Sequence, residues 1–257
     1  MEPENQPVRF RYPLKLVPMR LLLGSGGFRT PERQALLTRQ MQSFFGTIDE
    51  LLFVPYALKD HDRYVEVMTE RRLHAGLTLR GIHQESDPVR AVENAQAIYV
   101  GGGNTFRLLN ALYELNLVEP IAQRVTAGMP YMGVSAGTNV ACPSIMTTND
   151  MPIVYPPTFD ALALLPFQVN AHYFSGATYV KVGEEFQEHF GETRDDRLRE
   201  FHEMNDTPVV GLREGGLILA EEGRYTLVGA SARRFVKGAP PEDIAPGGAI
   251  WPPPLVL

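Results

Sequence analysis

Short apolar runs alternate with amphipathic stretches along most of this chain. Apolar residues at helical spacing predict helices over residues 36–45 and 64–73. Runs of strand length predict strands at residues 19–23, 51–55, 77–82, 97–100, 131–134, 209–212, 217–220 and 225–228. Because strands alternate with helices over the first half of the chain, we expect an α/β three-layer sandwich with a largely parallel central sheet. The last three strands are expected to be partly antiparallel.

The chain has 257 residues, of which 44% are hydrophobic, so it can bury a sizeable core. We expect one domain over residues 19–237. Residues 1–18 precede the first apolar run and are expected to be an N-terminal extension. The stretch 238–257 is rich in proline and glycine and is expected to be an irregular C-terminal tail.

The net charge of −6 argues against a nucleic-acid or anionic-membrane partner, because both require a dense basic surface. The single cysteine, Cys142, cannot form an intrachain disulfide, and it reads as a small core residue in a reducing compartment. No apolar run approaches the ~20 residues that span a bilayer. We therefore expect a cytoplasmic protein.

The run Tyr131-Met132-Gly133-Val134-Ser135-Ala136-Gly137 places a serine between two glycines directly after an apolar segment. This pattern is typical of a nucleophile elbow, where flanking glycines relieve the crowding around a strained serine. The backbone N–H of Ala136, at the start of the next helix, is a natural donor to an oxyanion. Glycine-bracketed serines also occur in ordinary turns, so the motif alone leaves both interpretations open.

A second glycine-rich segment, Gly101-Gly102-Gly103-Asn104-Thr105, follows the predicted strand at 97–100 and precedes an amphipathic helix. Three glycines allow backbone N–H groups to approach a ligand closely. The candidate ligands are a phosphate and the oxyanion of a tetrahedral intermediate. The segment lacks the Lys-Ser/Thr pair of a P-loop, which weakens the phosphate interpretation. A plain strand-to-helix turn is the remaining alternative.

A serine nucleophile needs a base, and His172 is the best candidate because it ends an apolar, strand-like run. His83 follows a strand and has no further support, and a core or surface role remains open for His172 itself. The other histidines lie in charged segments and are expected at the surface: His61, His74, His189 and His202. The histidines lack the H-E-x-x-H spacing, so no metal site is expected.

Two carboxylates are candidates for the group that orients the histidine. Asp150 is a lone acid in an uncharged loop, and Glu214 follows a predicted strand. The sequence does not choose between them. Asp150 is also a candidate for binding the amino group of a substrate, and either acid has an ordinary loop role as its alternative.

Five segments carry a resemblance when taken together: residues 101–106, 133–137, 139–143, 147–152 and 191–194. In this order they resemble the peptidase E family, the aspartyl dipeptidases that form serine peptidase family S51, over residues 19 to 237 or so. The resemblance implies a flavodoxin-like fold, similar to class I glutamine amidotransferases with a serine in place of their cysteine nucleophile. It also implies release of N-terminal aspartate from Asp-X dipeptides, without a cofactor.

Carried over residue by residue, the resemblance gives Ser135 as nucleophile and His172 as general base. It gives Asp150 as the first choice for the third member of the triad. Glu214 also matches a family position that has been given the acid role, and it stays as the alternative or as a fourth member.

The resemblance also gives the oxyanion hole and the substrate contacts. The amide of Gly102 or Gly103 and the amide of Ala136 would hold the oxyanion, and Asn104 and Thr105 would contact the substrate. Arg194 matches the position expected to bind the aspartate side chain. Arginine pairs with a carboxylate through two parallel hydrogen bonds, although the charged neighbours of Arg194 also allow a helix-surface role.

Other readings remain open. The first is a cyanophycinase-like enzyme that cleaves β-aspartyl bonds, and the second is a binding module without activity. An α/β-hydrolase esterase is less favoured, because its acid normally follows a later strand than Asp150 does. A small peptide is the expected partner and a homodimer is possible. The loop at 174–190 is expected to form a lid, to limit peptide length, or to do neither.

Overall fold

The computed structural model describes residues 19–251. Its central sheet has eight strands in the order β14-β11-β10-β1-β5-β4-β2-β3. Neighbours from β1 to β3 in this order pair in parallel, and β10, β11 and β14 extend the sheet in antiparallel pairs. The parallel strands are β1 (Leu21–Gly24), β5 (Tyr131–Val134), β4 (Ile98–Val100), β2 (Glu50–Val54) and β3 (Thr78–Gly81). The predicted α/β class with a largely parallel central sheet is confirmed.

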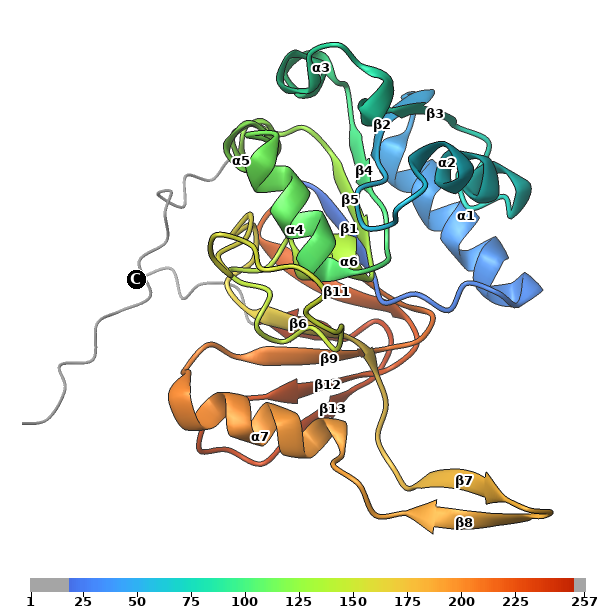
Figure 1. Cartoon of the computed structure of the whole chain (residues 1–257), viewed down its shortest axis with the longest axis vertical. Helices are drawn as coiled ribbons and strands as arrows, with labels where there is room; N and C mark the ends of the chain where they lie inside the picture. The colour runs from blue at the N-terminus through green and yellow to red at the C-terminus, as the bar shows by residue number, and fades with distance from the viewer. Residues whose placement is uncertain (1–18, 252–257) are drawn as a thin grey trace, which may run out of the picture.

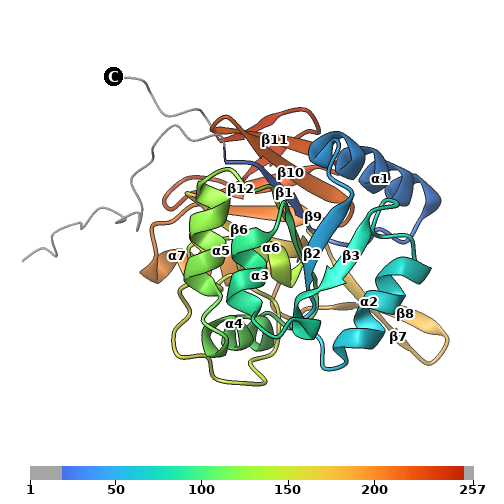
Figure 2. The same ribbon diagram turned by 90° about the horizontal axis from the view of Figure 1, so that it is seen from above.

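Helices cover both faces of the central sheet (Figure 1; Figure 2). One face packs against α1 (Pro31–Phe45) and α2 (His61–Glu70) through an aromatic-rich cluster. The other face packs against α3 (Pro88–Asn94), α4 (Thr105–Glu114) and α5 (Val118–Thr126). A short 3₁₀ helix, Ile82–Gln84, follows β3, and the four-residue helix α6 (Ala136–Asn139) follows β5.

A second sheet, which the sequence pattern did not predict, has the strand order β13-β12-β9-β6. Its strands β6 (Gln168–Tyr173) and β9 (Val209–Arg213) run parallel, and β12 (Ala232–Phe235) pairs antiparallel with β9. Apolar side chains of β6 and β9 join the main core beneath the antiparallel part of the central sheet. The helix α7 (Arg194–Met204) covers the outer face of this second sheet (Figure 1).

The C-terminal part of the described chain is more regular than expected. β10 (Gly216–Glu221) and β11 (Arg224–Gly229), where strands were predicted, pair antiparallel as a hairpin. Beyond residue 238, β13 (Glu242–Ile244) pairs with β12, and β14 (Ala249–Trp251) pairs with β11. The expected irregular tail is therefore wrong up to residue 251, because two strands of three residues are too short to leave an alternating pattern.

The expected N-terminal extension, residues 1–18, and residues 252–257 lie outside the described chain. The domain boundaries expected at residues 19 and 237 stay a prediction. Within residues 19–251, none of the helices combines the length and the apolar character needed to cross a membrane.

The loop expected at 174–190 contains a hairpin of β7 (Thr178–Val182) and β8 (Glu185–His189). The hairpin extends away from both sheets, and every residue of its two strands is exposed (Figure 1). It connects the end of β6 to the start of α7. The segment therefore joins the strand that carries His172 to the helix that begins at Arg194.

Candidate active site

Ser135 occupies a strained turn between β5 and α6, with φ +55° and ψ −111°. A Cβ added to Gly133 would lie 2.4 Å from the carbonyl oxygen of Gly137, and one added to Gly137 would lie 2.1 Å from that of Val100. Only glycine fits at both positions. The turn thus has the backbone of a nucleophile elbow, at the carboxyl ends of the parallel strands.

His172 lies against this serine. Its Nε2 atom is 2.8 Å from the Oγ of Ser135. His172 also has a positive φ, +55°, and the pairing of β6 with β9 shifts register between Ala171 and Tyr173. This bulge in β6 turns the imidazole from the second sheet toward the end of β5 in the central sheet.

Glu214 lies on the other side of the imidazole. Its Oε1 atom is 2.7 Å from the Nδ1 of His172. Glu214 directly follows β9, the parallel neighbour of β6, so the two strands end side by side. The side chains of His172 and Glu214 are 42% and 45% exposed, which leaves the row Ser135–His172–Glu214 open to a small molecule.

Asp150, the first choice for the third triad member, does not contact His172. Its Oδ2 atom accepts hydrogen bonds from the backbone N–H of Thr105, at 2.8 Å, and from the hydroxyls of Thr105 and Thr148, at 2.5 and 3.2 Å. This cluster lies at the N-terminus of α4, where a negative charge is favourable. The choice of Asp150 over Glu214 is thus corrected by the geometry, which gives Glu214 the hydrogen bond to His172.

The glycine-rich segment after β4 borders Ser135. A Cβ added to Gly102 would lie 3.0 Å from the Cβ of Ser135, and one added to Gly103, where φ is +138°, would lie 2.6 Å from the Ala57 carbonyl oxygen. Within residues 19–251, the N–H groups of Gly103 and Ala136 have no protein acceptor. Two unpaired donors beside a nucleophile are suited to an oxyanion.

Tyr64 supports the same segment, and sequence reasoning did not single it out. Its hydroxyl would lie 2.7 Å from a Cβ on Gly101, and its ring packs edge-on against Phe53. Burial raises the pKa of Tyr64 to about 12, and a hydrogen bond from the backbone of Gly102 acts in the opposite direction. Tyr64 therefore lies directly against the glycine-rich segment beside Ser135.

Asn104 and Thr105 have partners within the protein. The side chain of Asn104 accepts from the N–H of Arg107, which caps α4, and its Nδ2 donates to the Met151 carbonyl at 2.8 Å. The hydroxyl of Thr105 donates to Asp150. Both side chains thus fix the loop that carries Asp150.

Arg194 begins α7, whose first turn has a reciprocal cap between Thr193 and Asp196. The guanidinium lies 5.4 Å from the ring centre of Phe174, and its buried Nε has no hydrogen-bond partner within residues 19–251. Burial lowers the pKa of Arg194, and Arg197 adds to this effect. An unpaired, partly buried guanidinium is suited to binding a carboxylate.

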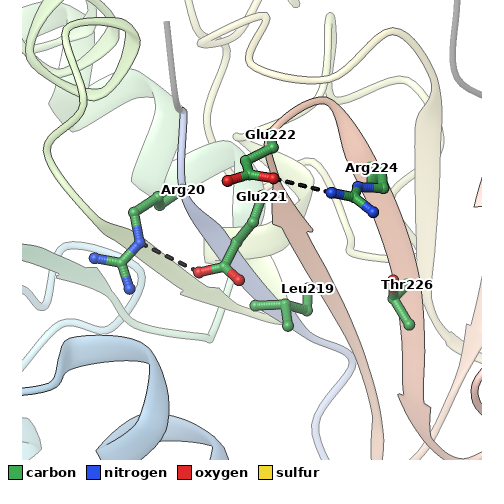
Figure 3. Close-up of a pocket in the computed structure, with 6 residues that line it drawn as sticks. All are labelled: Arg20, Leu219, Glu221, Glu222, Arg224 and Thr226. Atoms are coloured by element: carbon green, nitrogen blue, oxygen red, sulfur yellow. Dashed lines mark hydrogen bonds and ion pairs between the residues drawn. The ribbon is translucent and has the colours of Figure 1, made fainter.

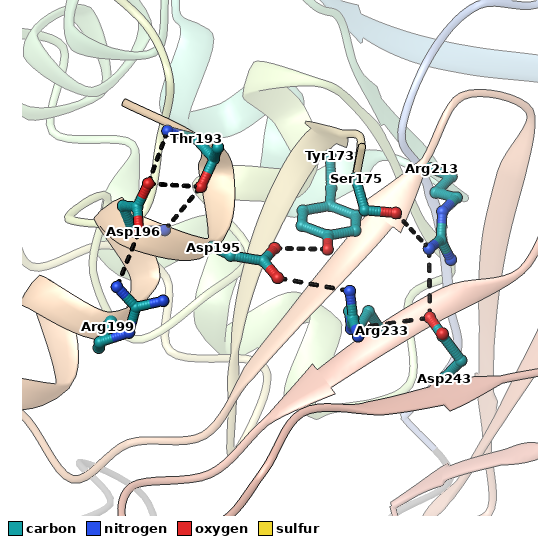
Figure 4. Close-up of polar contacts among 9 residues, drawn as sticks. All are labelled: Tyr173, Ser175, Thr193, Asp195, Asp196, Arg199, Arg213, Arg233 and Asp243. Atoms are coloured by element: carbon teal, nitrogen blue, oxygen red, sulfur yellow. Dashed lines mark hydrogen bonds and ion pairs between the residues drawn. The ribbon is translucent and has the colours of Figure 1, made fainter. Parts of the chain in front are cut away.

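A polar network fixes the first turn of α7 to the second sheet (Figure 4). The hydroxyl of Tyr173 donates to Asp195 at 2.6 Å, and the same carboxylate pairs with Arg233 at 3.3 Å. Arg213 pairs with Asp243 at 3.1 Å and stacks over the ring of Tyr173. The neighbours of His172, Arg194 and Glu214 are thus connected to one another.

A second feature that the sequence analysis missed is the loop after β1, Gly24-Ser25-Gly26-Gly27. It contacts the backbone or side chain of each member of the row Ser135–His172–Glu214. A serine and three glycines directly after an apolar strand are the signal that would have identified it.

A cavity of about 390 Å³ lies beside the turn between β10 and β11 (Figure 3). Arg20, one of its residues, precedes β1, whereas Ser135 donates its N–H to Gly24 at the other end of that strand. Its charged side chains pair with each other, Arg20 with Glu221 and Arg224 with Glu222. The cavity is therefore separate from Ser135. Its lining residues are Arg20, Leu219, Glu221, Glu222, Arg224 and Thr226.

Within the described residues, no group of three or more histidines, cysteines and acids is arranged to hold a metal ion. Cys142 is fully buried, and burial raises the pKa of its thiol to about 12. The chemistry available at Ser135 is therefore that of a hydroxyl, an imidazole and a carboxylate in a row, which suits nucleophilic acyl transfer.

Comparisons with known proteins agree with this chemistry. The model of Peptidase family S51 matches residues 20–228. Peptidase E of Streptomyces coelicolor is 50% identical over 204 residues, 78% of this chain and 80% of that protein. A Drosophila melanogaster protein named "Probable alpha-aspartyl dipeptidase" is 45% identical over 211 residues, 80% of this chain and 85% of its own. The structure of a peptidase from an acI-B1 Actinobacterium is similar in fold, with a TM-score of 0.62 at 17% identity, over 91% of this chain and 96% of that one.

Proposed function

Because the chain belongs to peptidase family S51, we propose that it is a serine dipeptidase that releases aspartate from the N-terminus of Asp-X dipeptides. The observation that carries the proposal is the hydrogen-bonded row of Ser135, His172 and Glu214, with 2.8 and 2.7 Å between the bonded atoms. The chain order of this row is Ser, His, Glu. It differs from the Ser, acid, His order of the α/β-hydrolases, which counts against the esterase alternative.

The proposed reaction is acyl transfer through Ser135. His172 takes the hydroxyl proton as Ser135 attacks the carbonyl carbon of the aspartyl residue, and Glu214 stabilises the imidazolium that forms. His172 then gives the proton to the leaving amine, and the peptide bond breaks. Water, activated by the same imidazole, hydrolyses the acyl-enzyme and releases aspartate.

The proposed oxyanion hole consists of the amides of Gly103 and Ala136. Both N–H groups are without a protein acceptor within residues 19–251. A single hydrogen-bond donor that is fixed where the oxyanion forms raises kcat by about 10²–10³-fold. Gly102 also contributes by leaving space beside Ser135.

We propose that Arg194 binds the side-chain carboxylate of the substrate. Its unpaired Nε and its partial burial support this role, because an uncharged side chain in the substrate would leave a desolvated cation without a partner. Replacing Arg194 with Met should lower kcat/KM for Asp-Leu by roughly 10²-fold and abolish the preference over Asn-Leu. A preference that survives the substitution would remove Arg194 from this role.

We propose that Asp150 binds the free amino group of the substrate. Its Oδ2 is occupied by three donors, and its Oδ1 has no hydrogen-bond partner among residues 19–251. Asn104 and Thr105 then serve substrate binding through the loop that they hold. A carboxylate at this position would restrict cleavage to the first peptide bond of a substrate with a free N-terminus.

The test is hydrolysis of Asp-Leu beside Glu-Leu, Asn-Leu, β-Asp-Leu and N-acetyl-Asp-Leu, by the wild type and by Ser135→Ala. Ser43→Ala, which removes an exposed hydroxyl from α1, is the matched control. We expect cleavage of Asp-Leu by the wild type and the control, and none by Ser135→Ala. Turnover of β-Asp-Leu alone would favour the cyanophycinase-like alternative. A binding module would show neither turnover nor covalent labelling of Ser135.

We also propose that the enzyme is a cytoplasmic homodimer. Tyr179 and Phe186 are exposed on one face of the hairpin β7–β8, and Val180 and Val182 on the other. A hairpin of two strands is marginally stable by itself, so contact with a second copy would supply the missing packing. Light scattering should give twice the chain mass for the wild type and less for Phe186→Ser. The cytoplasmic location rests on Cys142. It is a free, buried thiol, and free thiols are typical of proteins in a reducing compartment such as the cytoplasm.

A further inference from the structure

The segment Gly24–Gly27, which begins at the last residue of β1, hydrogen-bonds to all three segments that carry the row Ser135–His172–Glu214. The Gly24 carbonyl accepts from the N–H of Ser135 at 2.9 Å, and from the hydroxyl of Thr138. The Gly26 carbonyl accepts from the N–H of Gly215, next to Glu214, at 2.8 Å. Two sheets therefore meet at this loop.

Ser25 makes the third connection with its side chain. Its Oγ accepts a hydrogen bond from the backbone N–H of His172 and donates one to the carbonyl of Leu212, each at 2.8 Å. The side chain is fully buried. One hydroxyl thus joins the left-handed residue of β6 to the end of β9, two residues before Glu214.

The two glycines that follow Ser25 provide space for the side chains of the pair. A Cβ on Gly26, where φ is +133°, would lie 2.5 Å from the Cε1 of His172. A Cβ on Gly27, where φ is +71°, would lie only 1.5 Å from the Oε2 of Glu214. Arg33 holds the far side of the loop by donating to the Gly27 carbonyl at 3.1 Å.

We propose that Ser25 is a positioning residue for catalysis, which fixes the backbone of His172 and the approach of Glu214, and that Gly27 keeps open the space that Glu214 occupies. The inference rests on the proposed function for the identity of the reaction. It adds that the loop after β1 determines the geometry of the imidazole and the carboxylate. Small displacements of such groups are expensive, since a shift of about 1 Å costs roughly 10²-fold in rate.

The first experiment compares Ser25→Ala with Thr147→Val. Thr147 is the matched control because its buried hydroxyl also donates to the backbone of β6, at Val169, away from His172. We expect Ser25→Ala to lose about 10- to 100-fold in kcat on Asp-Leu with KM nearly unchanged, while Thr147→Val stays close to wild type. An equal effect of the two substitutions on kcat would overturn the proposal.

A second readout does not depend on the substrate. The proton on Nδ1 of His172, shared with Glu214, should give a downfield ¹H NMR resonance, and Ser25→Ala should shift or broaden it while Thr147→Val leaves it in place. The rate at which a sulfonyl fluoride labels Ser135 should fall in parallel. If the wild type fails to cleave Asp-Leu, the proposed function is lost, whereas these two readouts still decide the role of Ser25.

The glycine is tested by Gly27→Ala against Gly223→Ala. Gly223 has almost the same φ, +73°, but a Cβ there meets nothing within 4 Å, so the control carries the backbone strain without the collision. We expect Gly27→Ala to lower kcat at least 10-fold more than Gly223→Ala, with the melting temperatures of the two variants similar. Equal kcat in the two variants would show that Glu214 does not need this space.

Discussion

Two carboxylates were candidates for the third member of the triad, and their surroundings differ completely. Asp150 is bound by three donors at the N-terminus of α4, in a loop that the side chain of Asn104 fixes. Glu214 follows a strand of the second sheet, and its carboxylate contacts His172. The carboxylate of Asp150 is fixed by two hydroxyls and one backbone N–H. The carboxylate of Glu214 is placed to stabilise a positive charge on the imidazole of His172.

Strand order, rather than the local sequence, separates the two acids. Both are acids beside short polar segments, and each looks equally suited to orient a histidine. Glu214 meets His172 because β6 and β9 are parallel neighbours, although 42 positions separate the two residues. The different surroundings predict separate kinetic roles for the two acids.

The largest effect is expected for Glu214→Gln. An amide cannot stabilise the imidazolium, and it disturbs the tautomer of His172, so kcat should fall by a factor on the order of 10²–10⁴ with little change in KM. Steady-state kinetics on Asp-Leu measure this. Glu222→Gln, which alters an exposed acid at the turn after β10, should behave as wild type. A loss in Asp150→Asn that exceeds the loss in Glu214→Gln would reverse the comparison.

A smaller effect, on KM rather than kcat, is expected for Asp150→Asn. Removing the charge weakens the grip on the substrate amino group, so kcat/KM should fall about 10- to 100-fold through KM. Asp160→Asn, an exposed acid in the same loop, is the control. If N-acetyl-Asp-Leu becomes as good a substrate as Asp-Leu in the variant, the amino-group role is supported. A pure loss of kcat would instead return Asp150 to the triad.

The smallest effect on turnover is expected for Tyr173→Phe, which tests the polar network between α7 and the second sheet. The variant loses the hydrogen bond to Asp195 but keeps the ring that packs against Phe235. The free energy of unfolding should fall by about 1 kcal/mol, which corresponds to a melting temperature about 2–4 °C lower. A kcat change of more than about threefold in calorimetrically folded protein would show that the network reaches the catalytic row.

Cys142 follows α6 and contacts the second sheet, because its Sγ accepts the N–H of Val169 in β6. Its pKa is raised by burial to about 12 from a usual value of 9.0, so the folded protein keeps the neutral thiol. The unfolded chain ionises first, and stability is therefore lost as the pH rises above about 9. Iodoacetamide at pH 8 should label Cys142 only in urea, and labelling of the native enzyme would contradict this.

The sequence was sufficient to predict the features of the site that depend on neighbours in the chain. The glycines around Ser135 predict a strained serine, which has a positive φ in the structure, and the end of an apolar run locates His172 close to a strand end. Both effects are local. Parallel strands also end at one edge of the sheet, which brings the segment with Gly102 and Gly103 to Ser135.

The sequence could not predict what depends on contacts between distant segments. The choice of Glu214 over Asp150 requires the pairing of β6 with β9, and a strand pattern does not specify its partners. Ser25 contacts β6 at the bulge that contains His172, and the hydrophobic pattern of β6 does not reveal a bulge. The strands β13 and β14 are stabilised by the sheet edges that they join, rather than by their own composition.

The projecting hairpin gives the chain a place where it can be divided. Gly183 lies between β7 and β8, and a Cβ there would meet nothing within 4 Å. A protease cut at this tip would leave Ser135 and His172 on one fragment and Glu214 on the other. The two fragments would remain joined through the pairing of β6 with β9 and of β1 with β10. The turnover of a chain divided at Gly183 would therefore report whether its two fragments reassemble.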